Sequence, residues 1–145
     1  MQSKNFFIFI TILRTAVATL PTTLELLVFQ NGQRIGCVNG YGKFITSTAA
    51  CFLFQTQEIE GSENKNIWAS GYGTCSADSG VIECYEPQGA PAIFTQHGTD
   101  LELVGFGTTF SANSNPDASD RIGVDILVGE GGGETFLLQV HALSG

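Results

Sequence analysis

Four cysteines are the residues of this chain with the widest choice of chemistry, because a cysteine can bind a metal, act in redox exchange or form a disulfide. They lie in two pairs, in "CVNGYGKFITSTAAC" (Cys37 and Cys51) and in "CSADSGVIEC" (Cys75 and Cys84). Zinc sites normally combine close C-x2–4-C spacing with histidines, and both intervals here are much longer. A redox C-x-x-C motif is also absent. The spacing therefore favours disulfides over a metal site. Each disulfide would add about 2–4 kcal/mol to the stability of the fold.

The pairing of these cysteines is open at this stage, since four cysteines allow three arrangements. We expect Cys37–Cys51 and Cys75–Cys84, because each pair flanks a turn-rich segment that can double back as a hairpin. Disulfides persist in oxidising compartments, so the expectation depends on export of the chain.

Residues 1–18 have the order of an export signal: Lys4, the apolar stretch "FFIFITIL" and the small residues "AVA" before Thr19. A buried N-terminal strand is the alternative interpretation. The apolar stretch is too short to span a bilayer, and no later segment approaches about 20 apolar residues. We therefore predict a secreted, extracellular protein whose mature form is a single domain of residues 19–145.

The charge balance limits the partners of such a domain. The chain has 6 basic and 14 acidic residues and a net charge of −8. Loss of Lys4 and Arg14 with the signal would make the net charge about −10. A surface of this sign repels phosphate backbones, so we expect no nucleic-acid partner.

Side chains that could act as a catalytic base or nucleophile occur in only a few places. His97 lies between Thr95 and Asp100 in "TQHGTD", but a polar hairpin turn explains this segment better than a nucleophilic triad does. His141 falls in the alternating "LLQVHAL", where we place it on the polar face of a strand. No G-x-S-x-G motif is present.

Acidic residues could in principle supply the two carboxylates of a glycosidase. Asp78 and Glu83 lie within the second cysteine loop, where turn formation is the plainer role. The segment "GEGGGE" (129–134) lacks the Lys of a phosphate-binding loop and is bracketed by acids. We expect no cofactor and no enzymatic activity.

Aromatic residues close to the cysteines are the strongest indication of a binding role. Aromatic rings exposed on a sheet can stack against sugars, and we predict Tyr41, Trp68, Tyr72 and Tyr85 as such a platform. Asp78 and Asn39 would add hydrogen bonds. The alternative is that these rings pack over the disulfides in the core.

The elements that must position these residues are short strands. Apolar and polar residues alternate over a few positions at a time, and Asn31-Gly32 and Asn39-Gly40 are strong hairpin-turn signals. The predicted strands cover residues 23–30, 34–40, 42–47, 49–59, 67–73, 80–86, 92–96, 101–112, 121–129 and 135–143. Segment 49–59 is apolar on both faces and predicts a central strand. The fold class is therefore all-β, a single antiparallel β-sandwich or small barrel held by two disulfides.

Three segments taken together, "RIGCVNGYGKFITSTAACFLFQTQ", "WASGYGTCSADSGVIECYEPQ" and "IFTQHGTDLELVGFGTTFSANSNP", resemble the β-rich C-terminal domain of fungal ribonuclease T2 family proteins. The resemblance covers about residues 34–125. It is carried by Gly36, Cys37 and Cys51 in the first segment, by Gly73, Cys75 and Cys84 in the second, and by Leu103, Gly107, Thr109, Phe110 and Ala112 in the third.

What the resemblance implies is a non-catalytic module. The catalytic half of that family is an N-terminal domain with paired histidine segments, one reading "HGLWP", whereas His97-Gly98 is here followed by Thr99. A stand-alone module of this kind resembles small secreted fungal proteins, some of which act as effectors toward a host. We expect a polysaccharide of a cell wall or host as the ligand. A host protein bound by an effector-like chain is the alternative, and a hydrolase or ribonuclease is a third.

Overall fold

The computed structural model describes residues 19–85 and 89–143, and the predicted export signal lies outside these residues. The described part is all-β, as the sequence predicts. None of its helical segments has the length and apolar character that a membrane crossing requires. Its strands are β1 (Thr23–Gln30), β2 (Gln33–Val38), β3 (Phe44–Ile45), β4 (Phe54–Glu58), β5 (Lys65–Ala69), β6 (Gly73–Thr74), β7 (Phe94–His97), β8 (Asp100–Leu103), β9 (Thr109–Ala112), β10 (Leu127–Val128) and β11 (Glu134–Ala142), with one 3-10 turn, η1 (Thr48–Ala50).

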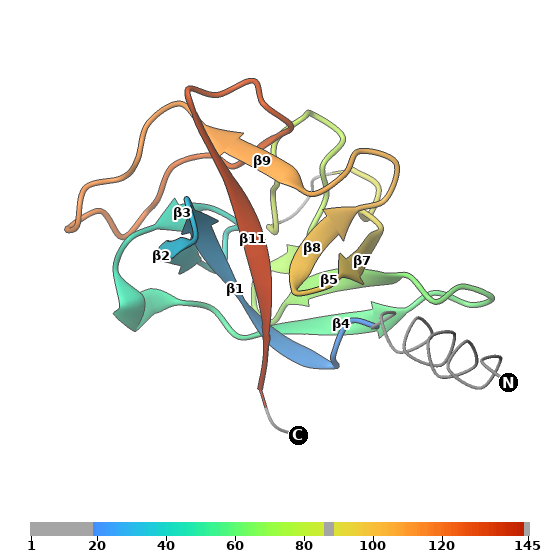
Figure 1. Ribbon diagram of the computed structural model, residues 1–145. Coiled ribbons are helices and arrows are strands. Elements are labelled where there is room, and N and C mark those ends of the chain that lie inside the picture. The colour runs from blue at the N-terminus through green and yellow to red at the C-terminus, as the bar shows by residue number, and fades with distance from the viewer. Residues whose placement is uncertain (1–18, 86–88, 144–145) are drawn as a thin grey trace, which may run out of the picture.

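Six antiparallel strands close into a barrel in the order β1-β4-β5-β7-β8-β11, and β11 pairs with β1 to complete the ring (Figure 1). Of the two predicted architectures, the barrel is therefore the observed one. The remaining strands extend it outward: β2 and β3 continue from β1, β9 and β10 continue from β11, and β6 pairs with β5.

The two long strands β1 and β11 can serve both the barrel and its extensions because each changes partner along one edge. The first residues of β1 pair with β4, and the residues from Leu27 onward pair with β2, with a register shift within that pairing between Val28 and Phe29. Strand β11 pairs with β9 through Glu134–Leu137 and with β8 at Gln139. This division lets a short chain build a closed core and still present loops beyond it.

The core forms because apolar and polar residues alternate along the strands and every second side chain of a strand faces the inside of the barrel. Apolar residues of all six barrel strands meet inside, with Phe94 of β7 among the fully buried rings. The same core cluster continues beneath the outer strands, where it includes Phe44, Phe110 and Ile126.

Several predicted strands differ from the observed ones. Segment 101–112 divides into β8 and β9, and the described residues of segment 80–86 form only isolated bridges. The strand predicted over 49–59 is observed only from Phe54 to Glu58, as β4, which lies between β1 and β5 in the sheet. The expectation that both of its faces are buried is wrong, since Leu53 is 49% exposed and Gln55 is exposed. Segment 121–129 contributes only β10 and isolated bridges. Gly123 has φ +92, a left-handed conformation that interrupts a strand.

Both predicted disulfides are present, Cys37–Cys51 and Cys75–Cys84. Cys37 lies on β2 and Cys51 follows η1, so the first bond ties the segment after β3 back to the sheet. The second bond closes the loop that follows β6 and holds Cys84 in the buried core.

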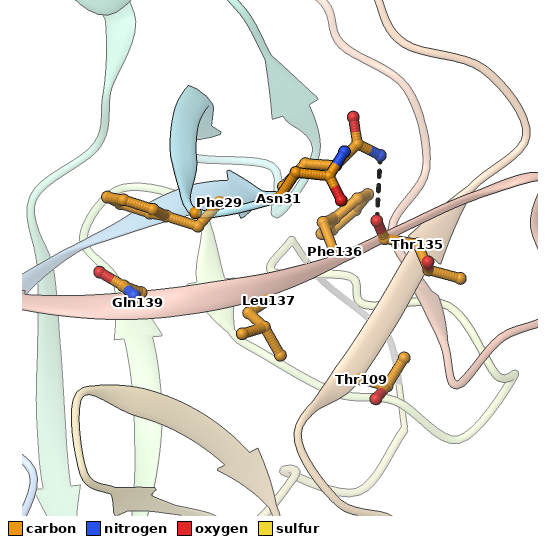
Figure 2. Close-up of a pocket in the computed structure, with 9 residues that line it drawn as sticks. Phe29, Asn31, Thr109, Thr135, Phe136, Leu137 and Gln139 are labelled. Atoms are coloured by element: carbon orange, nitrogen blue, oxygen red, sulfur yellow. Dashed lines mark hydrogen bonds between the residues drawn. The ribbon is translucent and has the colours of Figure 1, made fainter.

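The outer strands leave a hollow on the outer face of β11, between the β1–β2 turn and β9 (Figure 2). A separate pocket lies beside the β2–β3 hairpin, at the other end of β2.

Candidate functional site

The β2–β3 hairpin presents Tyr41 at its tip, in the segment "NGYGK" (39–43). Asn39 N donates to the carbonyl of Lys43, and Gly42 N donates to the carbonyl of Asn39, both at 2.9 Å. Gly40 and Gly42 are required by space, because a Cβ at Gly40 would lie 2.7 Å from the ring of Tyr72 and one at Gly42 2.8 Å from Sγ of Cys84. The hairpin therefore sits tightly against its neighbours.

Tyr41 is the centre of a series of aromatic rings. Its ring centroid lies 4.9 Å from that of Tyr72 and 5.6 Å from that of Tyr85, both in edge-to-face geometry. Tyr72 in turn meets Phe52 at 5.3 Å, and Phe52 meets the fully buried Phe54 at 5.1 Å. Edge-to-face pairs of this kind add about 0.5–1.5 kcal/mol each. A continuous series of ring contacts thus connects the exposed tyrosines to the buried core and holds them in place.

A turn from a distant part of the chain, residues 120–123, completes this surface. Asp120 Oδ1 accepts hydrogen bonds from the backbone N of Ile122 and Gly123 at 3.0 and 2.9 Å, which fixes the turn. The side chain of Ile122 is 71% exposed at its tip. Together, Tyr41, Tyr72, Tyr85 and Ile122 form what we call the tyrosine surface.

A pocket of about 310 Å³ opens within the tyrosine surface, lined by Tyr41, Lys43, Tyr85 and Ile122. Lys43 Nζ forms an ion pair with Oδ1 of Asp125, whose side chain is about half exposed. The pocket therefore combines apolar walls with the ammonium group of Lys43, whose ion-pair partner Asp125 has further hydrogen-bonding capacity.

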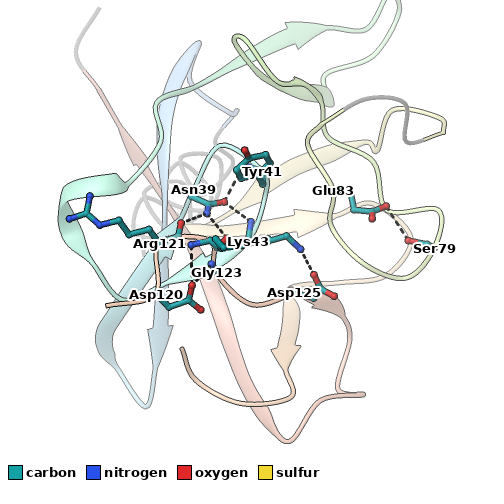
Figure 3. Close-up of polar contacts among 10 residues, drawn as sticks. Asn39, Tyr41, Lys43, Ser79, Glu83, Asp120, Arg121, Gly123 and Asp125 are labelled. Carbon is teal, nitrogen blue, oxygen red and sulfur yellow. Dashed lines mark hydrogen bonds and ion pairs between the residues drawn. The ribbon is translucent and has the colours of Figure 1, made fainter. Parts of the chain in front are cut away.

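Asn39 connects the two loops from below, as Figure 3 shows. Its Oδ1 accepts from the backbone N of Tyr41 and Lys43 at 3.1 and 3.0 Å. Its Nδ2 donates to the carbonyls of Arg121 and Ile122 at 3.3 and 2.9 Å. All four hydrogen-bonding positions of the amide are occupied, and the residue is only 5% exposed. Asn39 shapes the pocket from within the protein.

The other predicted site residues lie apart from the pocket. Trp68 is half-buried on β5, opposite Gln55 and Thr74, and among the described residues it makes no ring contact with the tyrosines. Asp78 accepts a hydrogen bond from Ala90 N at 2.9 Å and lines a different hollow, beside Phe106. Of the four predicted aromatic residues, the structure brings together the three tyrosines.

Residues with catalytic potential are placed separately from one another. His97 is exposed at the β7–β8 turn opposite Asp100, and His141 on β11 contacts Glu25 Oε1 at 3.3 Å. Glu83 accepts from the hydroxyl of Ser79 at 3.4 Å within its turn. Across residues 19–85 and 89–143, no three potential ligands gather as a metal site would require.

Sequence reasoning missed Lys43, Ile122 and Asp125. Lys43 pairs with a residue 82 positions away, and the segment around Ile122 carries no ligand-binding motif. The one relevant sequence signal is the pair of glycines that flank Tyr41, because glycines allow the backbone of a hairpin to pack closely against neighbouring side chains.

Comparison with known proteins places the chain in a family. Residues 18–135 match the model of the RNase T2-like C-terminal domain. The match is to that C-terminal domain, which is not the catalytic region. No curated protein and no solved structure is significantly similar to the chain. The chain belongs to the RNase T2-like C-terminal domain family.

Proposed function

We propose that this domain is a secreted, non-catalytic module that binds a cell-wall or host glycan through the tyrosine surface. The observation that carries the proposal is the exposure of braced rings around a pocket: Tyr41 is 43% and Tyr72 37% exposed, although both are held by neighbouring rings. Sugars offer C–H faces that stack on aromatic rings, with hydroxyls that need hydrogen-bond partners at the edge. Lys43 lines the pocket and would supply such a partner, together with Asp125, to which it is ion-paired.

The rigidity of the surface supports this assignment. A binding site whose side chains are already ordered loses less conformational entropy when the ligand binds. The tyrosines are ordered by ring contacts, and the turn beneath Ile122 is held by Asp120 and Asn39. These constraints would favour recognition of a rigid polymer surface.

A protein partner is the second candidate, favoured by the 71% exposure of Ile122 next to Tyr41. Tyrosines are enriched in protein interfaces, and the buried centre of an interface is more apolar than the rest of the protein surface. The tyrosine surface would then be the contact for a host protein, with the same residues involved.

Replacement of Tyr41 by alanine is expected to weaken glycan retention at least about tenfold, because an anchoring aromatic residue can contribute about 2 kcal/mol to binding. The measurement is a pull-down of the secreted, oxidised protein on insoluble chitin, β-glucan and cellulose, with competition by the soluble oligomer of the retaining polymer. Phe106→Ala is the matched control, since Phe106 is an aromatic residue that is 74% exposed and lies outside the tyrosine surface.

Equal loss in Tyr41→Ala and Phe106→Ala would contradict the assignment of the site. Absence of retention by the wild-type protein on every polymer would contradict glycan binding. Trp68→Ala, made in parallel, measures whether the binding area extends along β5.

A further inference from the structure

The hollow on the outer face of β11 has a composition that the tyrosine surface lacks (Figure 2). Its volume is about 250 Å³, just below the roughly 300–1,000 Å³ of pockets for drug-sized ligands. Apolar, amide and hydroxyl side chains line it, and none of the lining residues is charged although the chain has 14 acidic residues. The lining residues are Phe29, Gln30, Asn31, Gly32, Thr109, Thr135, Phe136, Leu137 and Gln139.

One wall of the hollow is held in place by the β1–β2 turn. Asn31 and Gly32 both have positive φ, +53 and +77, the conformation of a tight two-residue hairpin. Gln30 Nε2 reaches across to β11 and donates to the carbonyl of Thr135 at 3.0 Å and to Oε1 of Glu134 at 3.1 Å. This bridge fixes the turn against β11, so the hollow is formed before any ligand binds.

Three other polar side chains that line the hollow are available for hydrogen bonds to a ligand. Within the described part of the chain, the side chains of Gln139, Thr109 and Thr135 make no hydrogen bond. Phe29 and Leu137 lie directly opposite each other on β1 and β11, and both are half-buried on the outer face. The hollow thus offers an aromatic ring and an aliphatic side chain, surrounded by neutral donors and acceptors.

We propose that this hollow is a second saccharide site, which takes one neutral sugar unit. An ionic ligand would need a charged partner there, and the lining residues provide none. A neutral pyranose presents hydroxyls to amide and hydroxyl groups and a C–H face to a ring, which matches Gln139, Thr109 and Phe29. The small volume accommodates a single ring and excludes a long buried chain.

The hollow and the tyrosine surface lie far enough apart to contact different units of one polymer chain. The β1–β2 turn and the Tyr41 hairpin are at opposite ends of β2, which spans Gln33–Val38 and is about 20 Å long. Two sites at such a separation would bind a repeating polymer more tightly than either site alone, because the second contact is intramolecular. The ligand class rests on the proposed glycan function, whereas the location of this site does not.

The test is a titration of the ¹⁵N-labelled full protein with soluble oligomers of chitin, β-1,3-glucan and cellulose, followed by backbone amide chemical shifts. We expect saturable shifts at Asn31, Thr109 and Gln139 with a dissociation constant in the millimolar range or tighter. Gln139→Ala should weaken binding at these amides at least about fivefold by removing hydrogen bonds to the sugar. Gln57→Ala, an exposed glutamine on β4, is the matched control and should leave them unchanged.

Each result separates the two proposals. Shifts at these three amides that persist in Tyr41→Ala and weaken in Gln139→Ala support the second site. Shifts confined to the tyrosine surface overturn the second site and leave the proposed function intact. Shifts at neither place overturn both, and an equal effect of Gln139→Ala and Gln57→Ala overturns the second site.

Discussion

Asn39→Ala is expected to lower the free energy of unfolding by at least about 3 kcal/mol, since a buried polar group that loses its partner costs about 1–3 kcal/mol. The substitution removes hydrogen bonds to two backbone N–H groups and two carbonyls, those of Tyr41, Lys43, Arg121 and Ile122. It also removes the side-chain hydrogen bonds that join the hairpin to the turn at 120–123, so binding at the tyrosine surface should fall with stability. Urea denaturation followed by fluorescence measures the first effect.

The matched control for this prediction is Asn66→Ala. Asn66 is a half-buried asparagine whose side chain makes one hydrogen bond, from Nδ2 to the carbonyl of Ala92 at 2.9 Å. Its loss should cost about 1 kcal/mol and leave the tyrosine surface unchanged. If Asn39→Ala is no more destabilising than Asn66→Ala, the four hydrogen bonds of the Asn39 side chain do not stabilise the fold as predicted.

Removal of the Cys75–Cys84 disulfide, as the double variant Cys75→Ser and Cys84→Ser, is expected to destabilise the protein by about 2–5 kcal/mol. It should also loosen the tyrosine surface. Cys84 N donates to the carbonyl of Tyr41 at 3.0 Å, and Sγ of Cys84 lies directly behind Gly42. Thermal unfolding measures the stability, and retention on the binding polymer, at a temperature where the variant is folded, measures the surface.

The other disulfide provides the comparison. Cys37 and Cys51 are 14 residues apart and Cys75 and Cys84 are 9 apart, so chain entropy assigns the two bonds similar contributions. Loss of the Cys37–Cys51 disulfide should therefore lower stability by a similar amount. The folded protein without this disulfide should be retained on the binding polymer more strongly than the folded protein without Cys75–Cys84. Equal binding loss in both double variants would show that Cys84 has no specific role at Tyr41.

Local features of the fold could be predicted because they depend on neighbouring residues. Alternation along residues 23–30 and 135–143 identifies β1 and β11, and Asn31-Gly32 identifies the turn after β1. The turn-rich segments between the paired cysteines favour the observed disulfides, but four cysteines allow three arrangements, so the sequence leaves the choice open. The start of the strand within segment 49–59 is not predictable from the sequence, because a continuous apolar run has no period to show where a strand begins.

The candidate site was predictable only in part. The three tyrosines stand out by residue type and by their nearness to cysteines. Ile122 and Asp125 do not, because their approach to Tyr41 and Lys43 depends on contacts across about half the chain. Asn39 was expected to contact a ligand, whereas it bonds to the protein itself; an asparagine after a strand fits either role.

By itself, the sequence determined the all-β class, the hairpin turns and the family to which the chain belongs, and it favoured the observed disulfide pairing without selecting it. Only the tertiary structure decided that the sheet closes into a barrel, through the pairing of β1 with β11. It alone also decided which tyrosines meet and where the hollow on β11 forms. The physical reason is range: side-chain alternation and turn geometry act over a few residues, whereas barrel closure and pocket walls depend on packing between distant segments.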